Sequence, residues 1–183
     1  MTAASQLYSL YGLQWPLADI ANAAQTSIAM IYKYYGSQEG LAIAFLQHCE
    51  KSIQGEWEEP EEEFPNDPRN QIRSWIESKE IIATDADWSC FDLLRAAAFL
   101  LPYRGSRALA YIRKLKLQER NELAKRCKAA GFSDPKGLAD KLMLIVEGAM
   151  AGNLIHGLNG PSIELPKAAE AMMAGHQPLK SAA

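Results

Sequence analysis

The chain has 183 residues, of which 48% are apolar and 22% charged, and its formal net charge is −3. This composition is ordinary for a globular protein that buries a core. No run approaches the roughly 18 apolar residues that span a membrane, and no signal-peptide pattern is present. The cysteines, Cys49, Cys90 and Cys127, are odd in number and widely spaced, which argues against zinc motifs and disulfides and predicts reduced thiols in a cytoplasmic protein.

The N-terminal residues predict three short helices. An amphipathic first helix ends at Gly12, and a second begins at Pro16, where a missing N–H costs nothing at the first helical position. Thr26 or Ser27 can cap a third helix through its hydroxyl, and Gly36 is the residue type favoured just past a helix end. Two short helices separated by a tight turn are typical of a helix-turn-helix DNA reader.

The rest of the chain also predicts helices and no strand. A fourth helix opens at Ser37 and runs to about Trp57, and the acidic run at 56–63, broken by Pro60, is expected to be a solvated loop. The segment 88–101 is apolar almost all round and is therefore expected to be buried. Further helices are expected from residue 67 onward and at about 105–130, 135–157 and 166–174.

Two stretches of this sequence resemble the tetracycline-repressor-like (TetR) family of transcriptional regulators. The first is Ile20-Ala21-x-x-Ala24-x-x-Ser27-x-x-x-Ile31-Tyr32-x-Tyr34-Tyr35-x-Ser37-x-Glu39-x-Leu41, which is similar to the DNA-binding head of that family. The second is Ala-Gly-Phe-Ser-Asp-Pro-x-x-Leu-Ala-Asp-x-Leu at 130–142, followed by Glu147-Gly148-Ala149, which is similar to its dimer-forming helix. The resemblance implies an all-α fold, with a helix-turn-helix domain at 1–45 and a helical ligand-binding and dimerisation domain at 46–183.

By this resemblance, the DNA-facing residues lie on and beside the third helix. Ile31 and Tyr35 are four residues apart and are expected to pack toward the other helices. Tyr32 and Tyr34 would contact phosphates, while Lys33 would reach a phosphate or a base edge. The alternative interpretation is ordinary packing and surface residues of a small three-helix domain. The predicted DNA-binding residues are Ser27, Ile28, Ala29, Tyr32, Lys33, Tyr34 and Gln38.

The family resemblance also implies a small-molecule cavity among the later helices. Such sites are mostly apolar with a few polar groups, which predicts a hydrophobic or amphipathic effector oriented by Arg95 or Glu147. The alternative is that these side chains are core, because residues at helical spacing normally pack against one another. The candidate pocket residues are Trp75, Phe91, Leu94, Arg95, Phe99, Tyr103, Tyr111, Met143 and Glu147.

The helix predicted at 135–157 is the candidate dimer interface. Gly148 and Gly152 are four residues apart, and each costs roughly 1 kcal/mol relative to Ala in a helix, so close packing against a second helix would account for them. A bend beside a ligand is the alternative. The predicted interface residues are Leu142, Ile145, Gly148, Ala149 and Gly152.

The resemblance therefore implies a ligand-responsive transcriptional regulator, a repressor, that binds a palindromic operator as a homodimer. No catalytic motif, metal-ligand cluster or cofactor motif is found, so we expect neither an enzyme nor a cofactor. One departure favours an alternative. Lys33 is the single lysine or arginine of residues 1–50, against Asp19, Glu39 and Glu50, although phosphate neutralisation supplies most non-specific DNA affinity. The alternative is a TetR-like helical dimer with lost or narrowed DNA binding that acts as a small-molecule or protein-interaction module.

Overall fold

The computed structural model describes residues 2–84, 93–103, 105–157 and 159–177, except for the side chains of Ser9, Arg95 and Leu154. Its described residues are helical with no strand, which confirms the predicted all-α class. The helices are α1 (Thr2–Tyr11), α2 (Leu17–Ala23), α3 (Ile28–Tyr35), α4 (Gln38–Gly55), α5 (Glu58–Glu63), α6 (Pro68–Thr84), α7 (Leu93–Leu100), α8 (Arg107–Ala129), α9 (Pro135–His156), the 3₁₀ helix η1 (Pro161–Glu164) and α10 (Leu165–Ala174).

The chain divides into two compact units. Unit 1 comprises residues 1–53 and 89–116, and unit 2 comprises residues 54–88 and 117–183. Unit 1 therefore contains α7 and the first part of α8 as well as the N-terminal helices. The two units are defined by packing alone. The boundary expected at residue 45, between the DNA-binding domain and the rest of the chain, remains a prediction.

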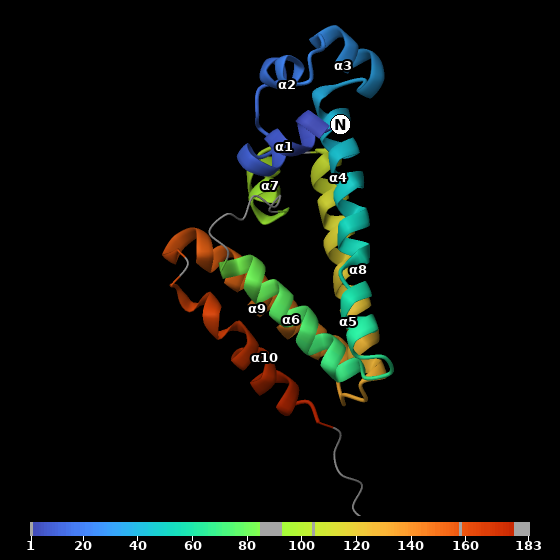
Figure 1. The fold of residues 1–183 in the computed structure, drawn as a ribbon, viewed down its shortest axis with the longest axis vertical. Coiled ribbons are helices and arrows are strands. Elements are labelled where there is room, and N and C mark those ends of the chain that lie inside the picture. The colour runs from blue at the N-terminus through green and yellow to red at the C-terminus, as the bar shows by residue number, and fades with distance from the viewer. Residues whose placement is uncertain (1, 85–92, 104, 158, 178–183) are drawn as a thin grey trace, which may run out of the picture. The chain divides into compact units, whose positions relative to one another are not determined.

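The core of unit 1 is built by α1 to α4 together with α7 and α8. Tyr8 and Phe45 lie at its centre, with their ring centroids 5.4 Å apart. Ala96 and Ile112 pack against the same cluster from α7 and α8. In Figure 1, α2 and α3 lie at the N-terminal end of α4, so the core presents this helix pair at one end of the unit.

The core of unit 2 is formed mainly by α6, α9 and α10, which lie side by side in Figure 1 and are in contact. One side of α6 is buried here, where Ile72, Trp75 and Ile76 lie at helical spacing and have almost no exposed surface. Asp134 caps α9 by accepting a hydrogen bond from Gly137 N at 3.0 Å, directly before Pro135. A polar cap followed by proline is the start signal that the sequence shows.

Two local predictions are wrong. The acidic run forms the short helix α5, because glutamate is a good helix former and carboxylates near a helix N-terminus interact favourably with the helix dipole. Pro60 is tolerated because it lies in the first turn. In the segment predicted to be buried all round, Leu94, Phe99 and Leu101 are exposed, whereas Ala96 is buried. Residues 88–92 lie outside the described part.

Candidate nucleic-acid interface

The turn between α2 and α3 is compact and closed by backbone hydrogen bonds. Thr26 N donates to Ala21 O at 2.9 Å, and Gln25 has a φ of +50°, which is a left-handed conformation. Glycine adopts this conformation without strain, whereas Gln25 adopts it here with a side chain. Ser27 is the N-cap of α3, and its Oγ accepts from Met30 N at 3.2 Å. The turn thereby sets where α3 begins.

The buried side of α3 is narrow. Ile31 is 5% exposed and Tyr35 is partly buried, which confirms that these two residues pack toward the other helices. The end of α3 is set by Gly36, whose φ is +75°. Ser37 then caps α4, because its Oγ accepts from Gly40 N at 2.9 Å. Both ends of α3 are therefore held by local hydrogen bonding and backbone conformation.

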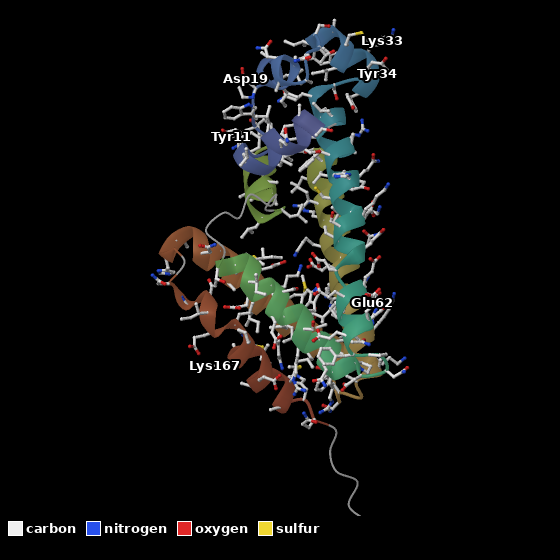
Figure 2. All side chains as sticks on the ribbon, viewed as in Figure 1. Tyr11, Asp19, Lys33, Tyr34, Glu62 and Lys167 are labelled. Atoms are coloured by element: carbon white, nitrogen blue, oxygen red, sulfur yellow. The ribbon has the colours of Figure 1, made fainter. Side chains whose placement is uncertain are left out.

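The remaining residues of α3 face solvent. All seven predicted DNA-binding residues are exposed, with Tyr34 the most exposed apolar side chain among them at 72%. Lys33 and Tyr34 lie on α3, and Asp19 lies on the neighbouring α2 (Figure 2). Met30 is also exposed, at 38%, and was missed by the sequence analysis. Met30 lies about 100° around the helix from Ala29, so helical geometry alone places it next to a predicted DNA-facing residue.

The N-terminal end of α4 adds two polar groups. Gln38 Nε2 lies 3.5 Å from Trp15 O, and its side chain is exposed. Glu39 turns instead toward α8, where its Oε1 accepts from Ser106 Oγ at 3.0 Å, Arg107 N at 2.7 Å and Ala108 N at 3.2 Å. Partial burial raises the pKa of Glu39, but these hydrogen bonds and the charge of Arg107 outweigh it and lower the pKa below its usual value. The Glu39 carboxylate is therefore engaged within unit 1.

The basic residues of α8 differ between the two units: three of those in unit 2 form ion pairs, and two of those in unit 1 are exposed. In unit 2, Arg120 pairs with Asp140, Lys125 with Glu122, and Arg126 with Glu61. In unit 1, Arg107 and Arg113 are exposed. Positive side chains thus lie on α8 of unit 1 as well as at Lys33.

The candidate pocket residues divide between the two units. In unit 1, Phe99 and Tyr103 have ring centroids 5.6 Å apart, and Tyr111 donates from its hydroxyl to Glu50 Oε2 at 2.5 Å. Leu94 of the same unit is exposed, at 42%. Phe91 and the side chain of Arg95 lie outside the described residues, so the orienting role of Arg95 remains a prediction.

The other three pocket candidates are in unit 2. Trp75 is fully buried and stacks on Trp57 with centroids 5.2 Å apart and an interplanar angle of 7°, and Met143 is buried in the same core. Glu147 is partly exposed. Trp75 is therefore a core residue, as the alternative interpretation allowed.

A buried charge cluster in unit 2 was not predicted. Lys79 is 6% exposed, and its Nζ lies 2.6 Å from Glu56 Oε2 and 3.3 Å from Glu119 Oε1. The indole N–H of Trp75 donates to Glu56 Oε2 at 3.3 Å, and Lys79 Nζ is 5.1 Å from the Trp75 ring centroid. The sequence does indicate the burial of Lys79, because this residue falls at helical spacing with the apolar residues Ile72, Trp75 and Ile76 of α6.

The structure corrects two of the predicted interface residues on α9. Leu142 is fully buried in the core of unit 2 and Ala149 is buried beside it, so neither has surface to offer a partner. Ile145 packs against the same core, and a Cβ on Gly152 would lie 3.2 Å from Ser162 Oγ. Gly148 is exposed with open space around it.

The exposed side of α9 carries different apolar residues. Leu144 is 69% exposed and Ile155 is 76% exposed, and with Gly148 and the partly exposed Ala151 they recur every three or four positions. This spacing places them on one stripe of the helix. The sequence analysis missed Leu144 and Ile155 because α9 is apolar on more than one side.

The described residues contain no cluster of three or more histidine, cysteine or carboxylate side chains that could hold a metal ion. Within the same residues, no helix is long and apolar enough to cross a membrane. Cys127 is a free thiol, and burial raises its pKa to about 12, so this thiol is protonated at neutral pH. Cys90 lies outside the described residues.

Comparison with known proteins identifies the fold. No protein-family model and no curated protein matches this sequence. Among solved structures, a TetR-family transcriptional regulator from Streptomyces coelicolor matches with a TM-score of 0.83 and 16% identity, over 97% of this chain and 93% of that chain. A TetR-type transcriptional regulator from Streptomyces avermitilis matches with a TM-score of 0.80 and 22% identity, over 96% of this chain and 94% of that chain.

A third solved structure was determined with a ligand. It is assigned as a transcriptional regulator from Saccharomonospora viridis, is in complex with choline, and matches with a TM-score of 0.75 and 15% identity, over 94% of this chain and 92% of that chain. The three matches cover almost the whole chain. The fold is therefore that of TetR-family transcriptional regulators, as the sequence resemblance predicted.

Proposed function

We propose that this protein is a ligand-responsive transcriptional regulator, a repressor, that reads a palindromic operator with α3. The observation that carries the proposal is the exposure of Ile28, Ala29 and the Tyr32–Tyr34 run, while Ile31 of the same helix is buried. A helix that is capped, follows a tight turn and exposes this much apolar and aromatic surface at one end of a unit fits a major groove. The TetR-like fold supports the same role.

In this proposal the exposed residues of α3 divide between backbone and base contacts. The hydroxyls of Tyr32 and Tyr34 and the ammonium of Lys33 contact phosphates, which position the helix without carrying sequence information. Ser27, Ile28 and Ala29 lie at the N-terminal end of α3, the part of a recognition helix that approaches base edges. Gln38 adds a contact from the start of α4.

A palindromic operator requires a two-fold dimer, and we infer that its interface lies on the exposed side of α9. Leu144, Gly148 and Ile155 form an apolar stripe that the described residues of the chain leave exposed. Two such stripes packed about a two-fold axis would bury one another. Each half-site would then lie one DNA turn, roughly 34–36 Å, from the other.

The effector is proposed to be a small hydrophobic or amphipathic molecule. The choline complex of the structural neighbour from Saccharomonospora viridis supports a small-molecule role for this fold. An effector changes operator occupancy only if it binds the DNA-competent and DNA-incompetent arrangements with different affinities. We expect Glu147 or Arg95 to orient the ligand. The protein would act as a binding protein without catalytic activity, in the cytoplasm.

The second candidate is a TetR-like dimer that has lost or narrowed its DNA binding. It is favoured by one observation, the single lysine among the charged side chains of residues 1–50. Exposed Arg107 and Arg113 of unit 1 argue against it, since they add positive charge within the same compact unit. Salt dependence separates the two, because log affinity falls by about 0.9 per neutralised phosphate for each unit of log salt.

The test is a selection from a random duplex library. The full-length protein is expected to enrich a palindromic sequence, whereas a variant with Tyr32→Ala, Lys33→Ala and Tyr34→Ala enriches none. A control variant, Ile81→Ala, changes an exposed residue of unit 2 and should enrich the same sequence as the wild type. If the wild-type dimer enriches no sequence at low salt, the regulator proposal is wrong and the second candidate is favoured.

A further inference from the structure

The base-facing end of α3 carries almost no hydrogen-bonding side chains. Ile28, Ala29 and Met30 are the first three residues of the helix, and all three are exposed. Ser27 precedes them, but its Oγ is engaged as the helix cap by Met30 N at 3.2 Å. The side chains available to touch base edges here are therefore hydrocarbon and thioether groups.

Only one residue of α3 belongs to the types that commonly hydrogen-bond base edges. The α3 sequence Ile-Ala-Met-Ile-Tyr-Lys-Tyr-Tyr contains no arginine, asparagine or glutamine, so Lys33 alone could pair bidentately with a base, in its case guanine. Lys33 is the one cationic side chain of α3 and lies a full turn after Ala29. Tyr32 and Tyr34 point to the sides of the exposed face, since their helical angles differ from that of Lys33 by about 100°.

In the major groove, the one apolar group that a base presents is the 5-methyl of thymine. We propose that α3 recognises its operator mainly through thymine methyl groups, with Ile28 and Met30 as the specificity-determining residues and Ala29 allowing close approach. This inference rests on the proposed DNA-reading function and names the chemistry by which the site would discriminate sequence. It implies thymines in each half-site opposite the N-terminal turn of α3.

The small number of positive charges on α2 and α3 makes recognition of thymine methyl groups more important. Lys33 is the only basic residue that α2 and α3 provide, and Asp19 lies in the first turn of α2. Phosphate contacts therefore contribute fewer charges than in a basic head, and discrimination must come from contacts that follow base identity. Apolar contact with methyl groups is such a contact and is insensitive to salt.

The experiment uses the duplex that the full-length wild type selects from a random library. Each thymine is replaced in turn by deoxyuridine, which keeps the base-pairing edge and O4 and lacks only the 5-methyl group. We expect one or two positions per half-site at which affinity falls by about fourfold, or about fifteenfold when both half-sites are changed, as for the loss of one buried methyl contact each. Deoxyuridine outside the half-sites is expected to have no effect.

Protein variants then identify the partner of the methyl group. In Ile28→Ala or Met30→Ala the deoxyuridine penalty should largely disappear, because the contact is already absent. Tyr34→Phe, which removes only a hydroxyl, should weaken binding on all duplexes and keep the full penalty. Circular dichroism shows whether each variant retains the helical fold.

The outcomes separate the two claims. A wild type that enriches no duplex overturns the proposed function and this inference together. An enriched duplex whose half-sites lack thymine, or whose deoxyuridine forms all bind like the parent, overturns the inference alone. A deoxyuridine penalty that persists in both Ile28→Ala and Met30→Ala also overturns it, because the methyl groups are then sensed elsewhere.

Discussion

Glu39 Oε1 lies 2.7 Å from the backbone nitrogen of Arg107, so one carboxylate in the first turn of α4 caps the first turn of α8. The same oxygen accepts from Ser106 Oγ and Ala108 N, while Ser106 Oγ accepts from Leu109 N at 3.2 Å. Three of the four N–H groups that a helix start leaves without intrahelical partners are thereby satisfied. Within unit 1, the start of α4, directly after α3, is joined to α8.

We expect Glu39→Ala to lower the free energy of unfolding by about 1–2 kcal/mol at pH 7, the range for losing a helix cap. The pKa of Glu39 is lowered in the folded protein, so its contribution is present above the usual carboxyl pKa and is lost as pH falls through the folded value. Urea unfolding of the wild type and Glu39→Gln should therefore differ at pH 7, and the difference should shrink as the pH falls through the folded pKa. Glu62→Gln, at an exposed carboxylate of α5, is the control and should show no such difference.

The ion cluster around Lys79 predicts a large effect from a single substitution. Lys79→Met leaves the buried Glu119 carboxylate without this cation, which typically costs about 3–5 kcal/mol. The double variant Lys79→Met, Glu119→Gln should be more stable than Lys79→Met alone. Arg73→Met breaks the half-exposed pair with Glu170 and should cost about 1 kcal/mol or less in the same denaturation measurement. Equal losses for Lys79→Met and Arg73→Met would contradict this account.

Substitution of Tyr8, unlike the substitutions above, is expected not to reduce stability. Its hydroxyl is buried and has no hydrogen-bond partner among the described residues, and burial raises its pKa to about 12. An unsatisfied buried hydroxyl costs roughly 1–3 kcal/mol, while the ring packs on Phe45. Tyr8→Phe should therefore leave the thermal midpoint unchanged or raise it. A clear drop in the midpoint would show that the hydroxyl makes a stabilising contact.

The apolar stripe of α9 predicts which substitutions would disrupt the proposed dimer. Leu144→Glu together with Ile155→Glu places charges on the exposed stripe and should give monomers in sedimentation analysis, with little loss of helix content. Leu142→Ala, in the core, should instead reduce stability by about 2–5 kcal/mol. If the double glutamate variant remains a dimer, the interface lies on another surface.

Much of the fold could be predicted from local signals. The ends of α3 follow from Ser27 and Gly36, and the burial of Ile31 follows from helical spacing, because a short helix on a small core buries one narrow side. The start of α9 was equally clear from Asp134 and Pro135. These features depend on residues close together in the chain.

The failures have a common physical cause, which is that burial depends on distant partners. Helix α9 is apolar on several sides, so periodicity could not show that Leu142 faces the core while Leu144 faces solvent. Lys79 is a charged residue whose burial depends on Glu56 and Glu119 from other helices. For Glu58–Glu63, a run of charge predicts a solvated loop, whereas glutamate propensity and a tolerated first-turn proline favour the helix that forms.

The central claim, that α3 reads DNA sequence, is tested most directly by a specificity ratio. The affinity of the wild-type protein is measured for its selected duplex and for a scrambled duplex of equal length and composition, at near-physiological salt. We predict a ratio of about a thousand or more, as for sequence-specific DNA-binding proteins, and its collapse in the Tyr32→Ala, Lys33→Ala, Tyr34→Ala variant. A wild-type ratio near one, or a ratio that the triple variant leaves unchanged, would contradict the account.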